Sequence, residues 1–135
     1  MCGIVGFAGP ALGRAQLERA VRSLHHRGPD GYGIYIDPAE RAGLGHARLS
    51  VIDLERGAQP LFARDGDLVL VCNGEIYEFE RQREELRELG HEFYTDSDSE
   101  VILHLYCEHG MDFVRHLRGS MPSCCWTEPS ADCSR

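Results

Sequence analysis

The sequence predicts an α+β domain in which sheets and helices pack as layers. The chain has 135 residues, which is the length of one typical domain. Its composition, 42% hydrophobic and 27% charged, is ordinary for a globular protein. The strand-like segments come early in the chain, and most of the helical sequence comes later, without an internal repeat.

The first half of the chain alternates between strand and helix patterns. Residues 3–8, GIVGFA, are apolar and partly β-branched, which predicts a short buried strand. Apolar side chains at helical spacing predict a helix over residues 15–26. Residues 27–31 end that helix, because proline lacks a backbone donor and glycine frees φ. Strands are expected over residues 32–36 and 44–52.

The clearest strand prediction is the apolar run of residues 68–72, which Asn73-Gly74 ends. A charged amphipathic helix follows over residues 76–89, and Gly90 is its predicted C-terminal stop.

The last predicted elements are helical. Residues 93–94 are predicted to form a short extended segment. Residues 97–100, Ser-Asp-Ser-Glu, have the spacing of a capping box, so we expect an apolar helix to start there and to end at Gly110. A further turn is predicted over residues 112–117.

Charge and composition exclude several classes of function. The formal net charge of −8 disfavours a nucleic-acid or anionic-lipid surface. All 14 basic residues are arginine, so chemistry that needs a lysine amine is excluded. No apolar run reaches the roughly 20 residues of a membrane span. We therefore expect neither a nucleic-acid partner nor a membrane partner.

The six cysteines are expected to be thiols rather than disulfides. The N-terminus lacks the basic and apolar regions of a secretory signal, which predicts a cytoplasmic, reducing location. His104, Cys107 and His109 lie close together on a predicted helix, but their spacing fits no common zinc pattern. We therefore expect no metal site.

Cys2 is the first candidate for chemistry. A small residue after the initiator methionine permits removal of Met1, which would leave Cys2 with a free α-amine. The reference pKa of such an amine is about 7.7–8.0, so much of it is neutral near pH 7. The amine could then take the thiol proton, and one residue would supply both nucleophile and base. The alternative is that Cys2 is a small buried side chain.

Six motifs follow one another in the sequence. They are Cys2-Gly3-Ile4-Val5-Gly6, His26-Arg27-Gly28-Pro29-Asp30-Gly31, Gly45-His46-Ala47-Arg48-Leu49-Ser50-Val51-Ile52-Asp53, Gly57-Ala58-Gln59-Pro60-Leu61, Asn73-Gly74-Glu75-Ile76-Tyr77 and Ser97-Asp98-Ser99-Glu100-Val101-Ile102. With these motifs in this order, residues 2–118 resemble the class II glutamine amidotransferases, which are N-terminal-nucleophile hydrolases. The His-Arg-Gly-Pro-Asp-Gly motif is similar to that of the glutamine-hydrolysing asparagine synthetase branch.

The resemblance implies a reaction and three catalytic residues. The family hydrolyses the side-chain amide of glutamine and passes ammonia to a second domain. Cys2 would attack the amide carbon to form a thioester. Asn73 and Gly74 match the family's oxyanion hole, where an amide NH2 and a backbone N–H stabilise the developing O⁻. Without the other motifs, Asn73-Gly74 would read as a plain turn.

The resemblance also implies a set of substrate-binding residues. Arg48 matches the residue that binds the substrate's α-carboxylate. The alternative interpretation is that Arg48 is a solvated surface arginine. Asp98 matches the partner of the α-ammonium, with Glu75 in the same pocket; capping of the following helix is the other role open to Asp98. Leu49, Val51 and Ile52 match pocket-lining positions, which could equally be core strand.

The family fold implied is an αββα sandwich, helices outside two antiparallel sheets, and we expect it to be incomplete here on the C-terminal side. We divide the sequence into a partial amidotransferase type 2 domain, residues 2–118, and an aberrant tail, residues 119–135. The tail reads as a poor strand, with proline and two adjacent cysteines. Reading the codons implied by residues 121–127 in a shifted frame allows Ala-Phe-[Val/Leu/Met]-Leu-Leu-Asp, close to the family's strand. We therefore hypothesise a one-base frameshift near Arg118-Gly119, followed by a premature stop; the alternative is a divergent but real C-terminus.

Cofactors and partners follow from the same resemblance. Glutamine is the expected substrate. We expect no cofactor in this chain, because it has no glycine-rich phosphate-binding loop. ATP and magnesium are implied solely for the synthetase domain that amidates aspartate, which this sequence does not include. The family is often homodimeric, which cannot be inferred from these residues. Two alternatives stay open: an amidotransferase for another acceptor, and an inactive truncated fragment.

Overall fold

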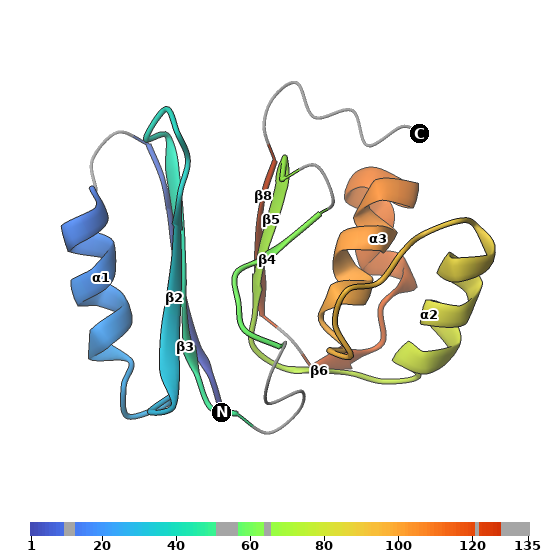
Figure 1. Cartoon of the computed structure of the whole chain (residues 1–135), viewed down its shortest axis with the longest axis horizontal. Helices are drawn as coiled ribbons and strands as arrows, with labels where there is room; N and C mark the ends of the chain where they lie inside the picture. The colour runs from blue at the N-terminus through green and yellow to red at the C-terminus, as the bar shows by residue number, and fades with distance from the viewer. Residues whose placement is uncertain (10–12, 51–56, 64–65, 121, 128–135) are drawn as a thin grey trace.

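Four layers make up the protein, as the computed structural model shows (Figure 1). The structure describes residues 1–9, 13–50, 57–63, 66–120 and 122–127. One helix covers the outer face of a first sheet, a second sheet packs on its inner face, and two helices cover the far side of the second sheet. This order confirms the predicted α+β class and the αββα sandwich.

The first sheet has the strand order β1-β3-β2 and is antiparallel throughout. Its outer face packs against α1, where Leu17 and Val21 are buried. Gly45 lets the helix approach, because a Cβ at that position would overlap with the Val21 side chain. The elements are β1 (Gly3–Ala8), α1 (Arg14–Ser23), β2 (Gly31–Ile36) and β3 (Ala42–Arg48).

The second sheet has the order β4-β5-β8, and its central strand is buried on both faces. Val69 and Val71 pack with Leu44 of the first sheet, so they fill the space between the sheets. Leu68 and Leu70 point to the opposite face and join the larger core beneath the helices. The strands are β4 (Leu61–Phe62), β5 (Leu68–Cys72) and β8 (Ser123–Thr127).

The remaining elements cover the second sheet. The helix expected from residue 76 begins later, because residues 75–76 pair with residues 119–120 as a small separate sheet. These elements are β6 (Glu75–Ile76), α2 (Phe79–Glu88), α3 (Glu100–His109), a 3-10 helix η1 (Gly110–His116) and β7 (Gly119–Ser120). No helix among the described residues has the length and apolar character needed to cross a membrane.

The predicted capping box does not form. Glu100 does not reach back to Ser97; its carboxylate instead accepts hydrogen bonds from the backbone N–H groups of Tyr94 and Thr95, at 2.8 and 2.7 Å. The segment 93–94, expected to be extended, belongs to no strand and is held by these contacts. Burial alone would raise the pKa of Glu100, but hydrogen bonds from His104, Thr95 and the two backbone groups lower it to about 2.

Two further expectations about strands need correction. The strand predicted over residues 44–52 ends at Arg48, and residues 51–56 lie outside the described part of the chain. The segment expected to be a poor strand does form one, since residues 123–127 pair antiparallel with β5, Ser123 opposite Cys72. The hydrogen bonds to the neighbouring strand β5 outweigh the weak strand propensity of residues 123–127.

Candidate active site

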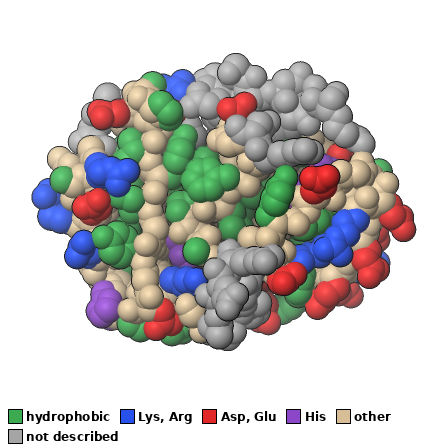
Figure 2. All heavy atoms as spheres, viewed as in Figure 1, with side chains coloured by type: hydrophobic (Ala, Val, Ile, Leu, Met, Phe, Trp, Pro, Cys, Tyr) green, Lys and Arg blue, Asp and Glu red, His purple; other side chains and the backbone are tan. Residues whose placement is uncertain are grey.

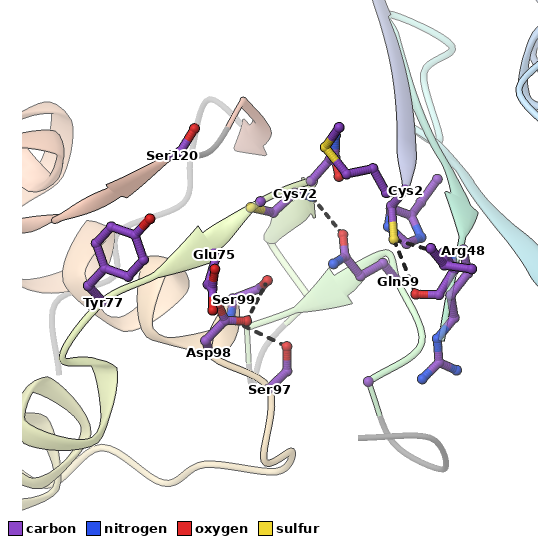
Figure 3. Close-up of a pocket in the computed structure, with 16 residues that line it drawn as sticks. Cys2, Arg48, Gln59, Cys72, Glu75, Tyr77, Ser97, Asp98, Ser99 and Ser120 are labelled. Carbon is purple, nitrogen blue, oxygen red and sulfur yellow. Dashed lines mark hydrogen bonds between the residues drawn. The ribbon is translucent and has the colours of Figure 1, made fainter. Parts of the chain in front are cut away.

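A cavity of about 440 Å³ opens where the two sheets meet the segment before α3 (Figure 3). Of the predicted site residues, seven line it: Cys2, Arg48, Leu49, Asn73, Gly74, Glu75 and Asp98. Val51 and Ile52 lie outside the described residues. The cavity also brings in residues to which the sequence analysis gave no site role: Met1, His46, Gly57, Gln59, Cys72, Tyr77, Ser97, Ser99 and Ser120.

Strand alternation explains why Cys2 faces the cavity. Ile4 of β1 points between the sheets, and side chains two residues apart share a face of a strand. The Cys2 sulfur accepts a hydrogen bond from the backbone N–H of Leu49 at 3.3 Å and lies 3.5 Å from the Leu49 carbonyl oxygen. Arg27 Nε donates to the Cys2 carbonyl oxygen at 3.0 Å. The thiol is therefore held at the mouth of the inter-sheet space.

Asn73 and Gly74 turn the chain at the end of β5. The backbone N–H of Asn73 donates to the Pro122 carbonyl oxygen at 3.0 Å. Gly74 has φ of 154°, in a region that side chains disfavour. Since the Asn73 backbone donor is already bonded, the turn can offer the cavity the Asn73 side-chain amide and the Gly74 N–H.

Asp98 supplies a buried carboxylate on the opposite wall. It is 6% exposed, and its Oδ2 accepts a hydrogen bond from the backbone N–H of Ile76 at 2.8 Å. Ser99 donates to Oδ1 at 3.3 Å. The N–H that Asp98 binds belongs to β6 rather than to α3, and no side chain caps α3. Asp98 therefore joins the wall of the cavity, with Glu75 beside it in Figure 3.

Arg48 and His46 lie on the same face of β3, because they are two residues apart and Leu44 on that face packs between the sheets. His46 is 2% exposed, and its Nε2 has no hydrogen-bond partner among the residues that the structure describes. Burial, followed by the charge of Arg48, lowers the pKa of His46 to about 4, against a weaker opposing effect of a hydrogen bond to Cys72. The ring is therefore neutral near pH 7.

The cavity is dipolar. Arg48 of β3 lines the cavity on the side of Cys2, although its guanidinium points away from the thiol, and the carboxylates of Asp98 and Glu75 lie on the other side (Figure 3). Such a site suits a small zwitterion, with a fork of N–H donors for one end and carboxylate oxygens for the other. Among the described residues, no group of His, Cys, Asp or Glu side chains is arranged to hold a metal ion.

Sequence reasoning gave no site role to several residues of this cavity, although His46 and Gln59 belong to the quoted motifs. His46 could have been found, because it alternates with Leu44 and Arg48 on a predicted strand. Gln59, which bonds to the backbone of Cys72, carries no periodic signal and depends on a contact across the sheet.

Known proteins resemble this chain in sequence. Residues 1–133 match the model of the glutamine amidotransferase domain. The chain is 44% identical over 123 residues to an asparagine synthetase [glutamine-hydrolyzing] of Brassica oleracea, covering 88% of this chain and 20% of that protein. It is 39% identical over 134 residues to asparagine synthetase [glutamine-hydrolyzing] 1 of Bacillus subtilis, covering 95% and 21%.

A solved structure shares the fold. It is the glutamine phosphoribosylpyrophosphate amidotransferase from B. subtilis complexed with ADP and GMP, with a TM-score of 0.74 and 21% sequence identity. The match covers 92% of this chain and 35% of that one. The chain spans about a fifth of the length of the curated relatives it matches.

Proposed function

This chain belongs to the glutamine amidotransferase domain family, and from that premise we propose that it hydrolyses the side-chain amide of glutamine. The reaction would be the glutaminase part of an asparagine synthetase-like enzyme, whose synthetase domain uses ATP and magnesium to amidate aspartate with the ammonia. The observation that carries the proposal is the convergence of a thiol, an Asn-Gly turn and opposite charges on one cavity. A cytoplasmic location fits the expected free thiols.

Cys2 is the proposed nucleophile. Once Met1 is removed, the α-amine of Cys2 takes the thiol proton, and the sulfur attacks the amide carbon of glutamine. The tetrahedral oxyanion lies between the Asn73 amide and the Gly74 N–H. The carbon–nitrogen bond then breaks, the amine returns the proton to the departing ammonia, and a thioester remains. Water hydrolyses the thioester to glutamate and regenerates the thiol.

Substrate recognition is proposed to use the charges of the cavity. Arg48 would bind the α-carboxylate of glutamine through its guanidinium fork. Asp98, with Glu75, would bind the α-ammonium. Leu49, whose N–H holds the Cys2 sulfur, would line the pocket near the reacting carbon, with Val51 and Ile52 proposed to extend that wall.

Ammonia release from glutamine tests the proposal. The chain is incubated with glutamine, ammonia and glutamate are measured, and Cys2→Ala serves as the matched control. Stoichiometric ammonia and glutamate from the parent chain, absent from Cys2→Ala, would support it. Absence of ammonia from the folded parent chain would contradict it and favour an inactive fragment.

Two further points are proposals. An amidotransferase for another acceptor is the second candidate, and identifying the acceptor of the ammonia would discriminate between the two. We also retain the division into a partial domain, residues 2–118, and an aberrant tail, residues 119–135. The nucleotide sequence past the Arg118 codon tests it, and an intact reading frame through the tail would contradict the frameshift.

A further inference from the structure

The strand that leads into the Asn73-Gly74 turn loses its neighbour just before the turn. On one side, β4 pairs with β5 through Leu61 opposite Leu70. Continued by two residues, that register would place Gln59 opposite Cys72. Hydrogen-bonded pairs alternate along an antiparallel ladder, and Ala63 and Leu68 form such a pair, since the Ala63 N–H donates to the Leu68 carbonyl oxygen. By the same alternation, Gln59 and Cys72 would exchange both of their backbone hydrogen bonds.

The backbone of Gln59 does not take that place. β4 begins only at Leu61, and the Gln59 carbonyl oxygen lies against Gly33 of the first sheet, where a Cβ would overlap with it. The side chain of Gln59 substitutes for the missing backbone partner. Its Oε1 accepts a hydrogen bond from the Cys72 N–H at 2.6 Å, which the dashed line in Figure 3 marks.

His46 of β3 reaches the same point from the other sheet, since His46 and Cys72 both line the cavity. The Gln59 side chain thus holds the Cys72 N–H that a neighbouring strand would otherwise hold.

We propose that Gln59 is a positioning residue that orients the Asn73-Gly74 donors toward the cavity. It fixes the N–H of Cys72 on the open side of β5, while Pro122 fixes the N–H of Asn73 on the other side. These contacts set the direction in which Asn73 and Gly74 leave β5. This inference rests on the proposed glutamine hydrolysis, because the oxyanion is what those donors would serve.

The matched variants are Gln59→Met, which keeps the length of the side chain without a strong acceptor, and Gln59→Glu, which keeps an acceptor oxygen. Misplaced donors weaken binding of the transition state more than that of the substrate. For Gln59→Met we expect kcat for ammonia release to fall roughly 10- to 100-fold, with KM changed by less than about threefold. A Gln59→Met variant that stays folded with kcat within about twofold of the parent would overturn the proposal.

Hydrogen exchange of the Cys72 amide supplies a readout that does not need activity. By NMR, the amide should be protected in the parent chain and in Gln59→Glu, and should exchange at least about tenfold faster in Gln59→Met. Equal exchange in Gln59→Met and the parent would overturn the inference. If the parent chain releases no ammonia, the proposed function fails, and the exchange still decides whether Gln59 holds Cys72.

Discussion

The two halves of the sandwich contribute to the cavity in different ways. The first sheet supplies the thiol and the guanidinium from the ends of its strands, Cys2 directly before β1 and Arg48 at the end of β3. The second half supplies the amide donors and the carboxylate from irregular backbone, at the Asn73-Gly74 turn and at Asp98 before α3. A strand fixes a side chain by its own alternation, whereas an irregular segment is fixed by distant contacts.

The largest effect is expected in the first half, at the nucleophile. Replacing Cys2 by serine keeps the size of the side chain but removes the thiol, and we expect ammonia release to fall at least about 10⁴-fold. The folded state should change little, because the sulfur makes weak hydrogen bonds to one residue, Leu49. The thermal midpoint and the rate of ammonia release are the measurements. A Cys2→Ser variant with near-parental activity would contradict the assignment.

A smaller effect is expected at the carboxylate of the second half. Asp98→Asn keeps an oxygen that can accept from the Ile76 N–H but removes the charge. Because a hydrogen bond to a charged group contributes about 1.5–3 kcal/mol, kcat/KM for glutamine should fall roughly 10- to 100-fold, mostly through KM. In the first half, the corresponding variant is Arg48→Lys, which keeps the positive charge but removes the guanidinium fork. A kcat/KM unchanged in Asp98→Asn would remove Asp98 from substrate binding.

These two halves also differ in what the sequence could predict. The strand at residues 3–8, the strand at 68–72 and the alternation of Leu44, His46 and Arg48 follow from local pattern. The role of Glu100 does not, because its partners are the N–H groups of residues 94–95 instead of the predicted capping position. Motif resemblance suggested which residues form the cavity, but the contacts that hold the irregular half come from pairing across the fold.

Glu100 tests whether the second half depends on such contacts. It is 3% exposed and holds residues 94–95 against the start of α3. Glu100→Ala should lower the free energy of unfolding by about 2–4 kcal/mol, because two backbone donors and the Thr95 hydroxyl lose their acceptor. Glu84→Ala, on the exposed face of α2, is the control and should change stability by less than about 0.5 kcal/mol. Equal stability of the two variants would show that the contacts of Glu100 are dispensable.

The smallest effect expected concerns His46 of the first half. Its pKa is lowered to about 4 in the folded chain and should be near 6.5 in the unfolded chain, so the unfolded chain binds the proton first as pH falls. Stability is therefore fully present above about pH 6.5 and is lost progressively toward pH 4. His46→Asn should make the decline between pH 6.5 and 5 shallower, measured by urea unfolding. The same slope in parent and variant would show that His46 is not buried in its neutral form.

Intact-protein mass spectrometry after a rapid acid quench tests the central claim most directly. With glutamine present, we predict that chains lacking Met1 gain the mass of glutamine minus ammonia, and that fragmentation places the adduct on Cys2. The adduct should disappear on addition of hydroxylamine, because a thioester is readily cleaved by it. Glutamine turnover without an adduct on Cys2, or an adduct on Cys72 or Cys107, would contradict the account.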